Sequence, residues 1–132
     1  MLVFLVRHAH AEKGEPDAAR PLSERGRKEA SALARQLAGH DSRPSLVLTS
    51  PLVRARQTAE AIADEAGVEL HVDERLAPGA TLLFVREALQ EVDGGAPLAI
   101  VGHQPDLSEI AFELTGQDPG FPTGGVAEID LP

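Results

Sequence analysis

An arginine and a histidine, Arg7 and His8, stand directly after the short apolar run Leu2–Val6. An apolar run of this length is typical of a buried strand. A fixed cation and an imidazole at the end of a strand can hold an anion and attack it, and open α/β folds bind ligands at such ends. The pair indicates a site only if other strand ends bring partners to it.

Two further segments supply such partners. The polar segment Ser50–Thr58, which contains Arg54, follows the apolar run Leu46–Leu48. The segment Gly102–Pro105 follows the apolar run Leu98–Val101. Because the carboxyl ends of parallel strands lie at one edge of a sheet, we expect the three segments to meet in one crevice. The groups expected there are Arg7, His8, Arg54 and His103.

Two guanidiniums and two imidazoles form a set suited to an oxyanion. Guanidinium forks match phosphate oxygens in pairs. We also expect Arg54 in the first turn of a helix that Ser50 caps and Pro51 opens, where free N–H groups favour an anion. His8 could attack a bound phosphorus in line while the cations stabilise the charge on its oxygens. The product would be a covalent phosphohistidine that water hydrolyses.

The rest of the chain alternates strand-like and helix-like patterns. Strands are predicted at Leu2–Val6, Leu46–Leu48, Val68–Val72, Leu98–Val101 and Val126–Leu131. Helices are predicted from the Ser23 cap to Gly39, from Pro51 to Ala66, from the Thr81 cap to Gly94-Gly95, and from Pro105 to Leu114. This alternation predicts an α/β fold: a mainly parallel five-stranded sheet with helices on both faces, a three-layer αβα sandwich. Because a chain of 132 residues has the length of one typical domain, we expect a single domain over 1–132.

Composition narrows the class of protein. A net charge of −9 and an aromatic content of 3% disfavour binding to nucleic acid, which needs clustered cations or stacking rings. The chain has no cysteine, so disulfides, Cys-ligated zinc and thiol catalysis are excluded. The first apolar run is too short for a signal peptide or a membrane span. We therefore expect a cytoplasmic protein without membrane or nucleic-acid partners.

These motifs resemble a known family. Arg7-His8-Ala9 resembles the Arg-His-Gly signature of the histidine phosphatase superfamily, which has the phosphoglycerate mutase-like fold, with Ala in place of Gly. Ser50-Pro51-x-x-Arg54-Ala55-x-Gln57-Thr58 and Gly102-His103-x-Pro105 look like its other two motifs. Arg20-Pro21-Leu22-Ser23-x-x-Gly26 and Phe121-x-Thr123 are most similar to the SixA-like phosphohistidine phosphatases.

The resemblance carries specific implications for fold and site. It implies the sheet order 3-2-4-1-5 with the last strand antiparallel, and a single histidine phosphatase domain. It implies His8 as the nucleophile, with Arg7, Arg54 and His103 as the phosphate pocket. Arg20 would lie in the flanking loop, as a substrate-binding residue.

One departure from the larger superfamily members bears on the substrate. They carry an acidic residue that protonates an alcohol leaving group, in an insert that this chain lacks. Glu74 is the nearest candidate, and Glu12, Glu15 and Asp17 are expected in a solvated loop. An imidazole departs with less help than an alkoxide, so the missing acid fits a phosphohistidine substrate. The sequence thus predicts a metal-independent, cofactor-free phosphatase that hydrolyses phosphohistidine on a protein.

Three alternatives remain at this point. The chain could hydrolyse a small phosphorylated metabolite as a phosphomonoesterase of the same superfamily. It could bind a phosphorylated ligand in the same pocket without turnover. A metal-dependent hydrolase could use His8, His10 and His103 with a carboxylate, although Arg7 and Arg54 would crowd the cation with like charge.

Overall fold

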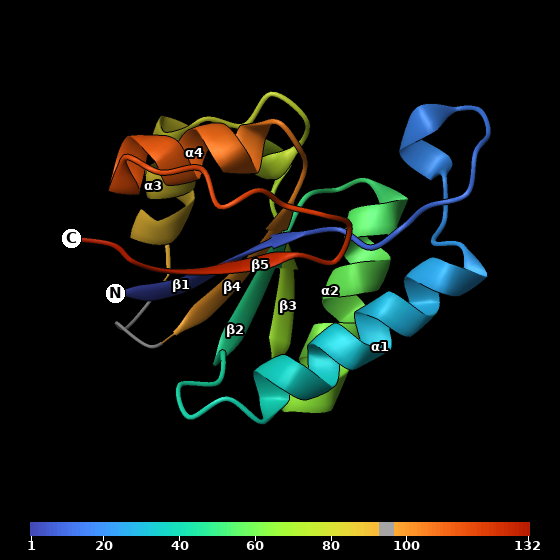
Figure 1. The fold of residues 1–132 in the computed structure, drawn as a ribbon, viewed down its shortest axis with the longest axis horizontal. Helices are drawn as coiled ribbons and strands as arrows, with labels where there is room; N and C mark the ends of the chain where they lie inside the picture. The colour runs from blue at the N-terminus through green and yellow to red at the C-terminus, as the bar shows by residue number, and fades with distance from the viewer. Residues whose placement is uncertain (93–96) are drawn as a thin grey trace.

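A five-stranded sheet forms the centre of the computed structural model, which describes residues 1–92 and 97–132 (Figure 1). The strands are β1 (Leu2–Arg7), β2 (Leu46–Thr49), β3 (Glu69–Val72), β4 (Leu98–Gly102) and β5 (Val126–Asp130). Their order is β3-β2-β4-β1-β5, with β5 antiparallel to β1 and the other pairs parallel. The predicted order and the antiparallel last strand are confirmed.

The two central strands fix where the chemistry-bearing segments emerge. All residues of β4 and the four central residues of β1 are buried, as their continuous apolar runs predict. In the parallel pairing, Arg7 lies opposite Gly102, and Thr49 of β2 lies opposite Val101. The residues that follow β1, β2 and β4 therefore leave the sheet side by side at one edge.

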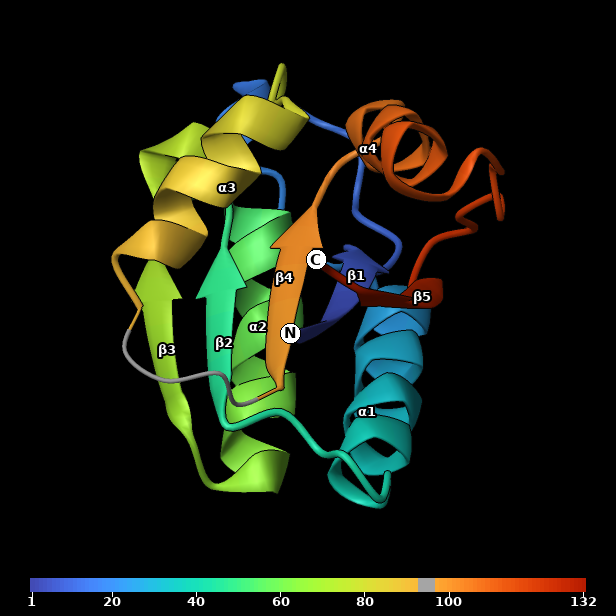
Figure 2. The same ribbon diagram turned by 90° about the vertical axis from the view of Figure 1, so that its left-hand side faces the viewer.

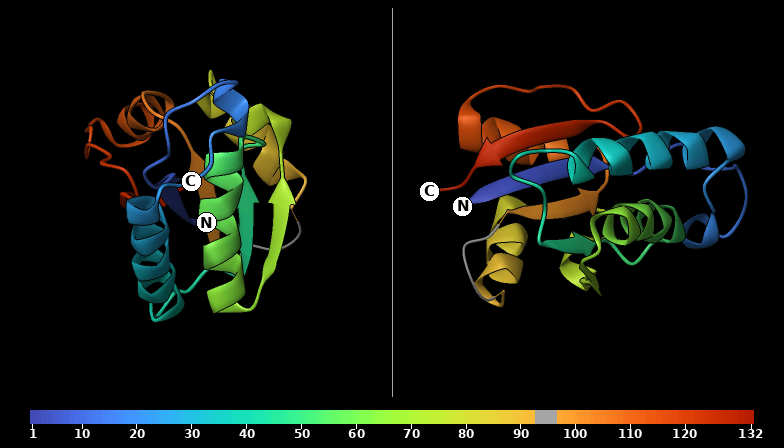
Figure 3. Two further views of the ribbon diagram at one scale, coloured as in Figure 1. Left: turned by 90° about the vertical axis from the view of Figure 1, so that its right-hand side faces the viewer. Right: turned by 90° about the horizontal axis from the view of Figure 1, so that it is seen from below.

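Helices cover both faces of the sheet, which confirms the three-layer arrangement. The helices α1 (Glu24–Ala38) and α2 (Val53–Ala66) lie side by side on one face (Figures 1 and 3). The helices α3 (Leu82–Gln90) and α4 (Asp106–Thr115) cover the other face (Figure 2). Alternate residues of β1 serve the two cores: Phe4 and Val6 pack toward α1 and α2, and Val3 and Leu5 toward α3 and α4.

The helix starts were predicted with mixed success. Ser23 and Thr81 cap α1 and α3 as expected, each accepting a backbone N–H of the first turn. Ser50 was expected to cap α2, and that prediction is wrong. The helix starts after Leu52, and the Ser50 hydroxyl lies in the preceding loop against His103. At the other end of α3, the helix stops at Gln90, and the predicted stop at Gly94-Gly95 lies outside the described residues.

The two chain ends lie together, at the end of the sheet opposite the carboxyl ends of the parallel strands (Figure 1). The Met1 amine donates to Asp130 Oδ1 at 3.0 Å and to the Leu131 carbonyl at 2.9 Å. Among the residues that the structure describes, none belongs to a helix with the length and apolar character needed to cross a membrane.

Candidate active site

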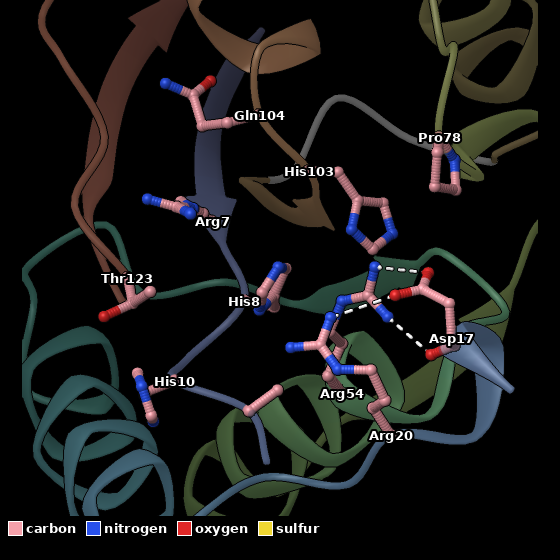
Figure 4. A pocket seen from close by; sticks show the side chains of 11 residues that line it. Arg7, His8, His10, Asp17, Arg20, Arg54, Pro78, His103, Gln104 and Thr123 are labelled. Carbon is pink, nitrogen blue, oxygen red and sulfur yellow. Dashed lines mark hydrogen bonds and ion pairs between the residues drawn. The ribbon is translucent and has the colours of Figure 1, made fainter. Parts of the chain in front are cut away.

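A pocket of about 410 Å³ lies at the carboxyl ends of β1 and β4 (Figure 4). It is lined by Arg7, His8, His10, Ala11, Asp17, Arg20, Arg54, Pro78, His103, Gln104 and Thr123. All five site residues expected from the sequence, Arg7, His8, Arg20, Arg54 and His103, are among them. The structure thus brings together residues from three strand ends and one loop.

His8 is held in one orientation and one tautomer. Its Nδ1 lies 2.7 Å from the Ala9 carbonyl oxygen, which can only accept, so Nδ1 carries the proton. The lone pair is then on Nε2. Burial lowers the pKa of His8 to about 4, and the positive charges of Arg54 and Arg7 act in the same direction. At neutral pH His8 is therefore an uncharged imidazole with a free nucleophilic nitrogen.

His103 lies against His8, with ring centroids 5.2 Å apart and ring planes tilted by 54°. Its Nε2 lies 2.7 Å from the Ser50 hydroxyl, and its buried Nδ1 has no hydrogen-bond partner among the described residues. Burial lowers the pKa of His103 to about 3, assisted by the neighbouring His8 and Arg54. Both imidazoles are therefore neutral in the pocket at neutral pH.

Arg54 is only 7% exposed and is oriented by Asp17. Its two terminal nitrogens donate to the Asp17 carbonyl at 3.0 Å and to the Asp17 carboxylate at 3.2 Å. The same carboxylate accepts from Arg20 at 3.0 Å, and Arg20 also donates to the Glu12 carbonyl at 2.7 Å. Asp17 therefore bridges two arginines, which hold the pKa of its carboxyl below its usual range.

Arg7 completes the positive wall of the pocket. One terminal nitrogen donates to the carbonyl of the buried Phe121 at 2.9 Å. Its Nε is buried and without a partner among the described residues. A buried guanidinium N–H without an acceptor is costly unless a ligand supplies one. This is an electrostatic setting suited to a phosphate oxygen.

A hydroxyl ties the end of β1 to the start of α2. Thr58 Oγ1 accepts from the Ala9 backbone N–H at 3.0 Å and donates to the Arg54 carbonyl at 2.9 Å. Thr58 is fully buried, so this link is not shared with solvent. It couples the position of His8 to that of Arg54.

A second anchor holds the chain just beyond His8. The Glu29 carboxylate on α1 accepts from the His10 backbone N–H at 2.9 Å and from Thr123 Oγ1 at 3.2 Å. The His10 imidazole lies 2.7 Å from the Ser23 hydroxyl.

Within residues 1–92 and 97–132, no three His, Cys, Asp or Glu side chains are grouped so that they could hold a metal ion. The alternative of a metal site at His8, His10 and His103 gains no support from this geometry.

Gly26 allows α1 to approach the chain around His10 closely enough for the Glu29 contact to form. A Cβ at this position would lie 1.8 Å from the His10 carbonyl oxygen, so only glycine lets the first turn of α1 approach the His10 backbone. The predicted Ser23-x-x-Gly26 stretch thus serves both the helix cap and the support of the pocket loop. Sequence reasoning identified the residues but not this contact.

Sequence reasoning missed the contacts of Asp17 and Ser50, and its candidate for an acid lies outside the pocket lining. Asp17 was expected in a solvated loop, and its side chain is 62% exposed as expected, but its contact with Arg54 was not anticipated; Ser50 was expected as a helix cap. The structure places Asp17 in the pocket lining and the Ser50 hydroxyl against His103. Glu74, the nearest candidate for an acid, is exposed and is not among the lining residues. No local pattern marks Asp17, because its role depends on Arg54, 37 residues away.

Comparison with known proteins agrees with the fold and the motifs. The sequence model of the histidine phosphatase superfamily (branch 1) matches residues 3–78. The phosphohistidine phosphatase SixA of Escherichia coli (strain K12) is 30% identical over 138 residues, covering 99% of this chain and 86% of that protein. An uncharacterized protein of Picosynechococcus is 38% identical over 124 residues, covering 89% of this chain and 73% of that one.

Solved structures are similar over the same length. The structure of the protein histidine phosphatase SixA complexed with tungstate matches with a TM-score of 0.89 at 30% identity. The match covers 99% of this chain and 88% of that chain. The similarity therefore extends over the whole sheet and its four helices, not only over the motifs.

Proposed function

This chain belongs to the histidine phosphatase superfamily, and from that premise we propose that it hydrolyses phosphohistidine on a protein, through a phosphoryl intermediate on His8. The family makes it a phosphatase. The substrate, the intermediate and the independence from metal ions are the proposal. Support for each comes from the groups that line the pocket.

The first step is attack by His8 on phosphorus. The Nε2 lone pair forms the new P–N bond while the bond to the substrate nitrogen breaks. The proton on Nδ1 stays hydrogen-bonded to the Ala9 carbonyl, which stabilises the positive charge that develops on the ring. Arg7, Arg54 and His103 would hold the phosphoryl oxygens, where charge is spread in the transition state.

The choice of substrate rests on which acidic groups line the pocket and on what they contact. Among the described residues that line the pocket, Asp17 is the only carboxylate. Hydrogen bonds and charge from Arg20 and Arg54 lower the pKa of its carboxyl, so Asp17 is ionised at neutral pH and cannot donate a proton. An alkoxide leaving group needs such a donor, which typically contributes about 10²–10⁴-fold in rate. An imidazole leaving group does not need one to the same degree.

The second step returns the enzyme to its starting state. Water attacks phosphorus, the P–N bond to His8 breaks, and inorganic phosphate leaves with the water oxygen. His8 recovers its lone pair on Nε2 and keeps the proton on Nδ1. Arg7, Arg54 and His103 would hold the phosphoryl oxygens in this step as in the first.

A solved structure of a relative supports an oxyanion as the kind of ligand that this fold binds. That SixA structure is complexed with tungstate, a tetrahedral oxyanion like phosphate. In this chain, the buried Nε–H of Arg7 has no acceptor among the described residues, and such an anion would supply one. This mode of binding does not need a metal ion or side chains that coordinate one.

The proposal is tested by turnover on two classes of substrate. A protein carrying phosphohistidine and a panel of phosphomonoesters are offered to the wild type and to His8→Ala, with a chelator present. We expect the wild type to favour phosphohistidine and His8→Ala to lose turnover of both. An acid-labile, base-stable phosphoryl group should be trapped on the wild type alone. As a matched control, His71→Ala changes an exposed histidine outside this pocket and should retain the wild-type rate.

Each alternative has its own signature in this assay. Faster turnover of esters than of phosphohistidine would contradict the proposed substrate and favour a small metabolite. Activity that survives in His8→Ala would contradict the nucleophile. Phosphate binding without any trapped intermediate would favour a binding module. Loss of wild-type turnover in the chelator would contradict metal independence.

A further inference from the structure

The hydroxyl of Ser50 contacts a pocket residue but has no part in the proposed mechanism. Ser50 follows β2 and is fully buried, and its backbone N–H donates to the Val101 carbonyl at 3.0 Å. Its Oγ lies 2.7 Å from Nε2 of His103, which follows β4. The neighbouring strands β2 and β4 therefore fix the hydroxyl and the imidazole relative to each other.

The direction of this hydrogen bond follows from the other partner of Ser50. The Leu52 backbone N–H donates to Ser50 Oγ at 3.3 Å, so the hydroxyl oxygen already accepts one bond. Within the described residues, the only other partner of this hydroxyl is His103 Nε2. If Nε2 carried a proton, the buried hydroxyl hydrogen would have no acceptor, at a cost of about 1–3 kcal/mol. The Ser50 O–H therefore donates to Nε2, which carries the lone pair.

That direction determines what His103 presents to the pocket. A neutral imidazole has one N–H, so a lone pair on Nε2 leaves the proton on Nδ1. Nδ1 is the buried nitrogen of His103 that has no partner among the described residues. A buried, unpaired N–H in a positive pocket is a donor for an anion. With the opposite tautomer, the same nitrogen would direct a lone pair at the oxygens of the phosphoryl group.

We propose that Ser50 is a positioning residue: its hydroxyl fixes His103 as the Nδ1–H tautomer, so that this N–H is available to a phosphoryl oxygen. The proposal rests on the proposed function only for the identity of the bound anion. His8 and His103 then share one tautomer but have opposite roles. The Ala9 carbonyl leaves His8 a lone pair for attack, and Ser50 leaves His103 an N–H for binding.

The tautomer can be measured directly on the intact protein without substrate. Long-range ¹H–¹⁵N correlation of the imidazole rings, near pH 7, reports which nitrogen of His103 carries the proton. We expect Nδ1–H in the wild type and a population of Nε2–H in Ser50→Ala. The affinity for inorganic phosphate should fall about tenfold or more in Ser50→Ala, which removes only the hydroxyl. Ser50→Thr keeps a hydroxyl and should restore the Nδ1–H signal.

A matched control separates this role from a general effect of serine removal. Ser45 precedes β2, and its hydroxyl donates to the Pro97 carbonyl at an exposed site. Ser45→Ala should leave the His103 tautomer and the phosphate affinity unchanged. Thermal unfolding of each variant identifies any that fails to fold. If Ser50→Ala does not fold, the wild-type spectrum still decides which tautomer His103 adopts.

The outcomes distinguish this proposal from the proposed function. An Nε2–H signal on His103 of the wild type overturns the assignment, whatever the enzyme hydrolyses. An unchanged tautomer and unchanged phosphate affinity in folded Ser50→Ala overturn the role of Ser50. If the wild type shows Nδ1–H and loses phosphate affinity with Ser50→Ala but does not hydrolyse phosphohistidine, the positioning role stands and the substrate proposal fails.

Discussion

The pocket has two parts that differ in burial and in how they are held. We call His8, Arg54 and His103 the pocket floor; they are 9%, 7% and 4% exposed. We call Asp17 and Arg20 the pocket rim; their side chains are 62% and 27% exposed. The floor residues follow β1 and β4 or lie in the first turn of α2, whereas the rim comes from the loop around the short helix η1 (Asp17–Ala19).

This difference separates two kinds of electrostatic effect. In the floor, burial keeps imidazoles neutral, and single hydrogen bonds decide which nitrogen has a proton. In the rim, water screens the charges, so an exposed ion pair contributes little to stability. We therefore expect substitutions in the floor to change the chemistry and substitutions in the rim to adjust binding.

The largest effect is expected from Arg54→Lys in the floor. Lysine is a point charge and cannot keep both hydrogen bonds to Asp17 while binding a phosphoryl group as a fork. We expect kcat/KM for phosphohistidine to fall by about 10²–10³-fold, the usual cost of losing a donor to a developing oxyanion. Steady-state kinetics would measure this.

Arg56→Lys is the matched control for that variant, since Arg56 lies on the same helix with an exposed side chain. It should retain wild-type kinetics. Arg20→Lys in the rim should cost less than about tenfold. If Arg20→Lys reduced turnover as much as Arg54→Lys, the distinction between floor and rim would fail.

The next effect is a loss of stability in mild acid that arises from the floor. His8 has a pKa of about 4 in the folded protein, against about 6.5 when unfolded. The unfolded chain therefore binds more protons between these values, so the free energy of unfolding falls as pH drops from about 6.5 to 4. The slope is about 1.4 kcal/mol per pH unit for one histidine. His103, with a pKa of about 3, also lowers the free energy of unfolding as pH drops, and its effect continues below pH 4.

Urea unfolding at a series of pH values would measure this slope. His8→Asn removes one of the two titrations and should flatten the curve by about 3 kcal/mol between pH 6.5 and 4. The rim carboxylate Asp17 has a lowered pKa, so its stabilising contribution is lost only below about pH 3.9. An equal slope in wild type and His8→Asn would refute the neutral state of His8.

Gly26→Ala tests the support beneath the loop that joins floor and rim. The added Cβ would meet the His10 carbonyl at 1.8 Å, so the backbone must shift. We expect a loss of about 1–3 kcal/mol in the free energy of unfolding, as for other overpacked sites. Gly39→Ala is the matched control: Gly39 has helical backbone angles and an ordinary 3.4 Å contact. It should be neutral or slightly stabilising, and equal losses in both variants would contradict the role of Gly26.

The smallest effect is expected from Asp17→Asn in the rim. Asparagine keeps an oxygen for the arginines, and the Asp17 carbonyl still accepts from Arg54. The variant loses a negative charge beside the anion site, so inorganic phosphate should bind up to about fivefold more tightly. Competitive inhibition by phosphate would measure this. Binding weakened more than tenfold would mean that the rim carboxylate is essential for orienting Arg54.

Much of the fold could be predicted from local patterns. The five strands were found because continuous apolar runs and alternating runs have few other interpretations in a chain of this length. The caps of α1 and α3 were found because Ser23 and Thr81 act on N–H groups within their own first turns. The sheet order was not derivable from these patterns; it came from the resemblance of the motifs and is confirmed by the pairing of β1 with β4 and β5.

The sequence by itself determined that Arg7, His8, Arg54 and His103 lie at one edge of the sheet, and the tertiary structure decided their partners and their state. Parallel strands end at one edge, so Arg7, His8, Arg54 and His103 had to gather once the strands were assigned. The bond from Asp17 to Arg54 spans 37 residues, and that from Ser50 to His103 spans 53. Tautomer, pKa and ionisation depend on burial and on these contacts, because both the energy of a charge and the direction of a hydrogen bond are set by the surroundings that folding creates.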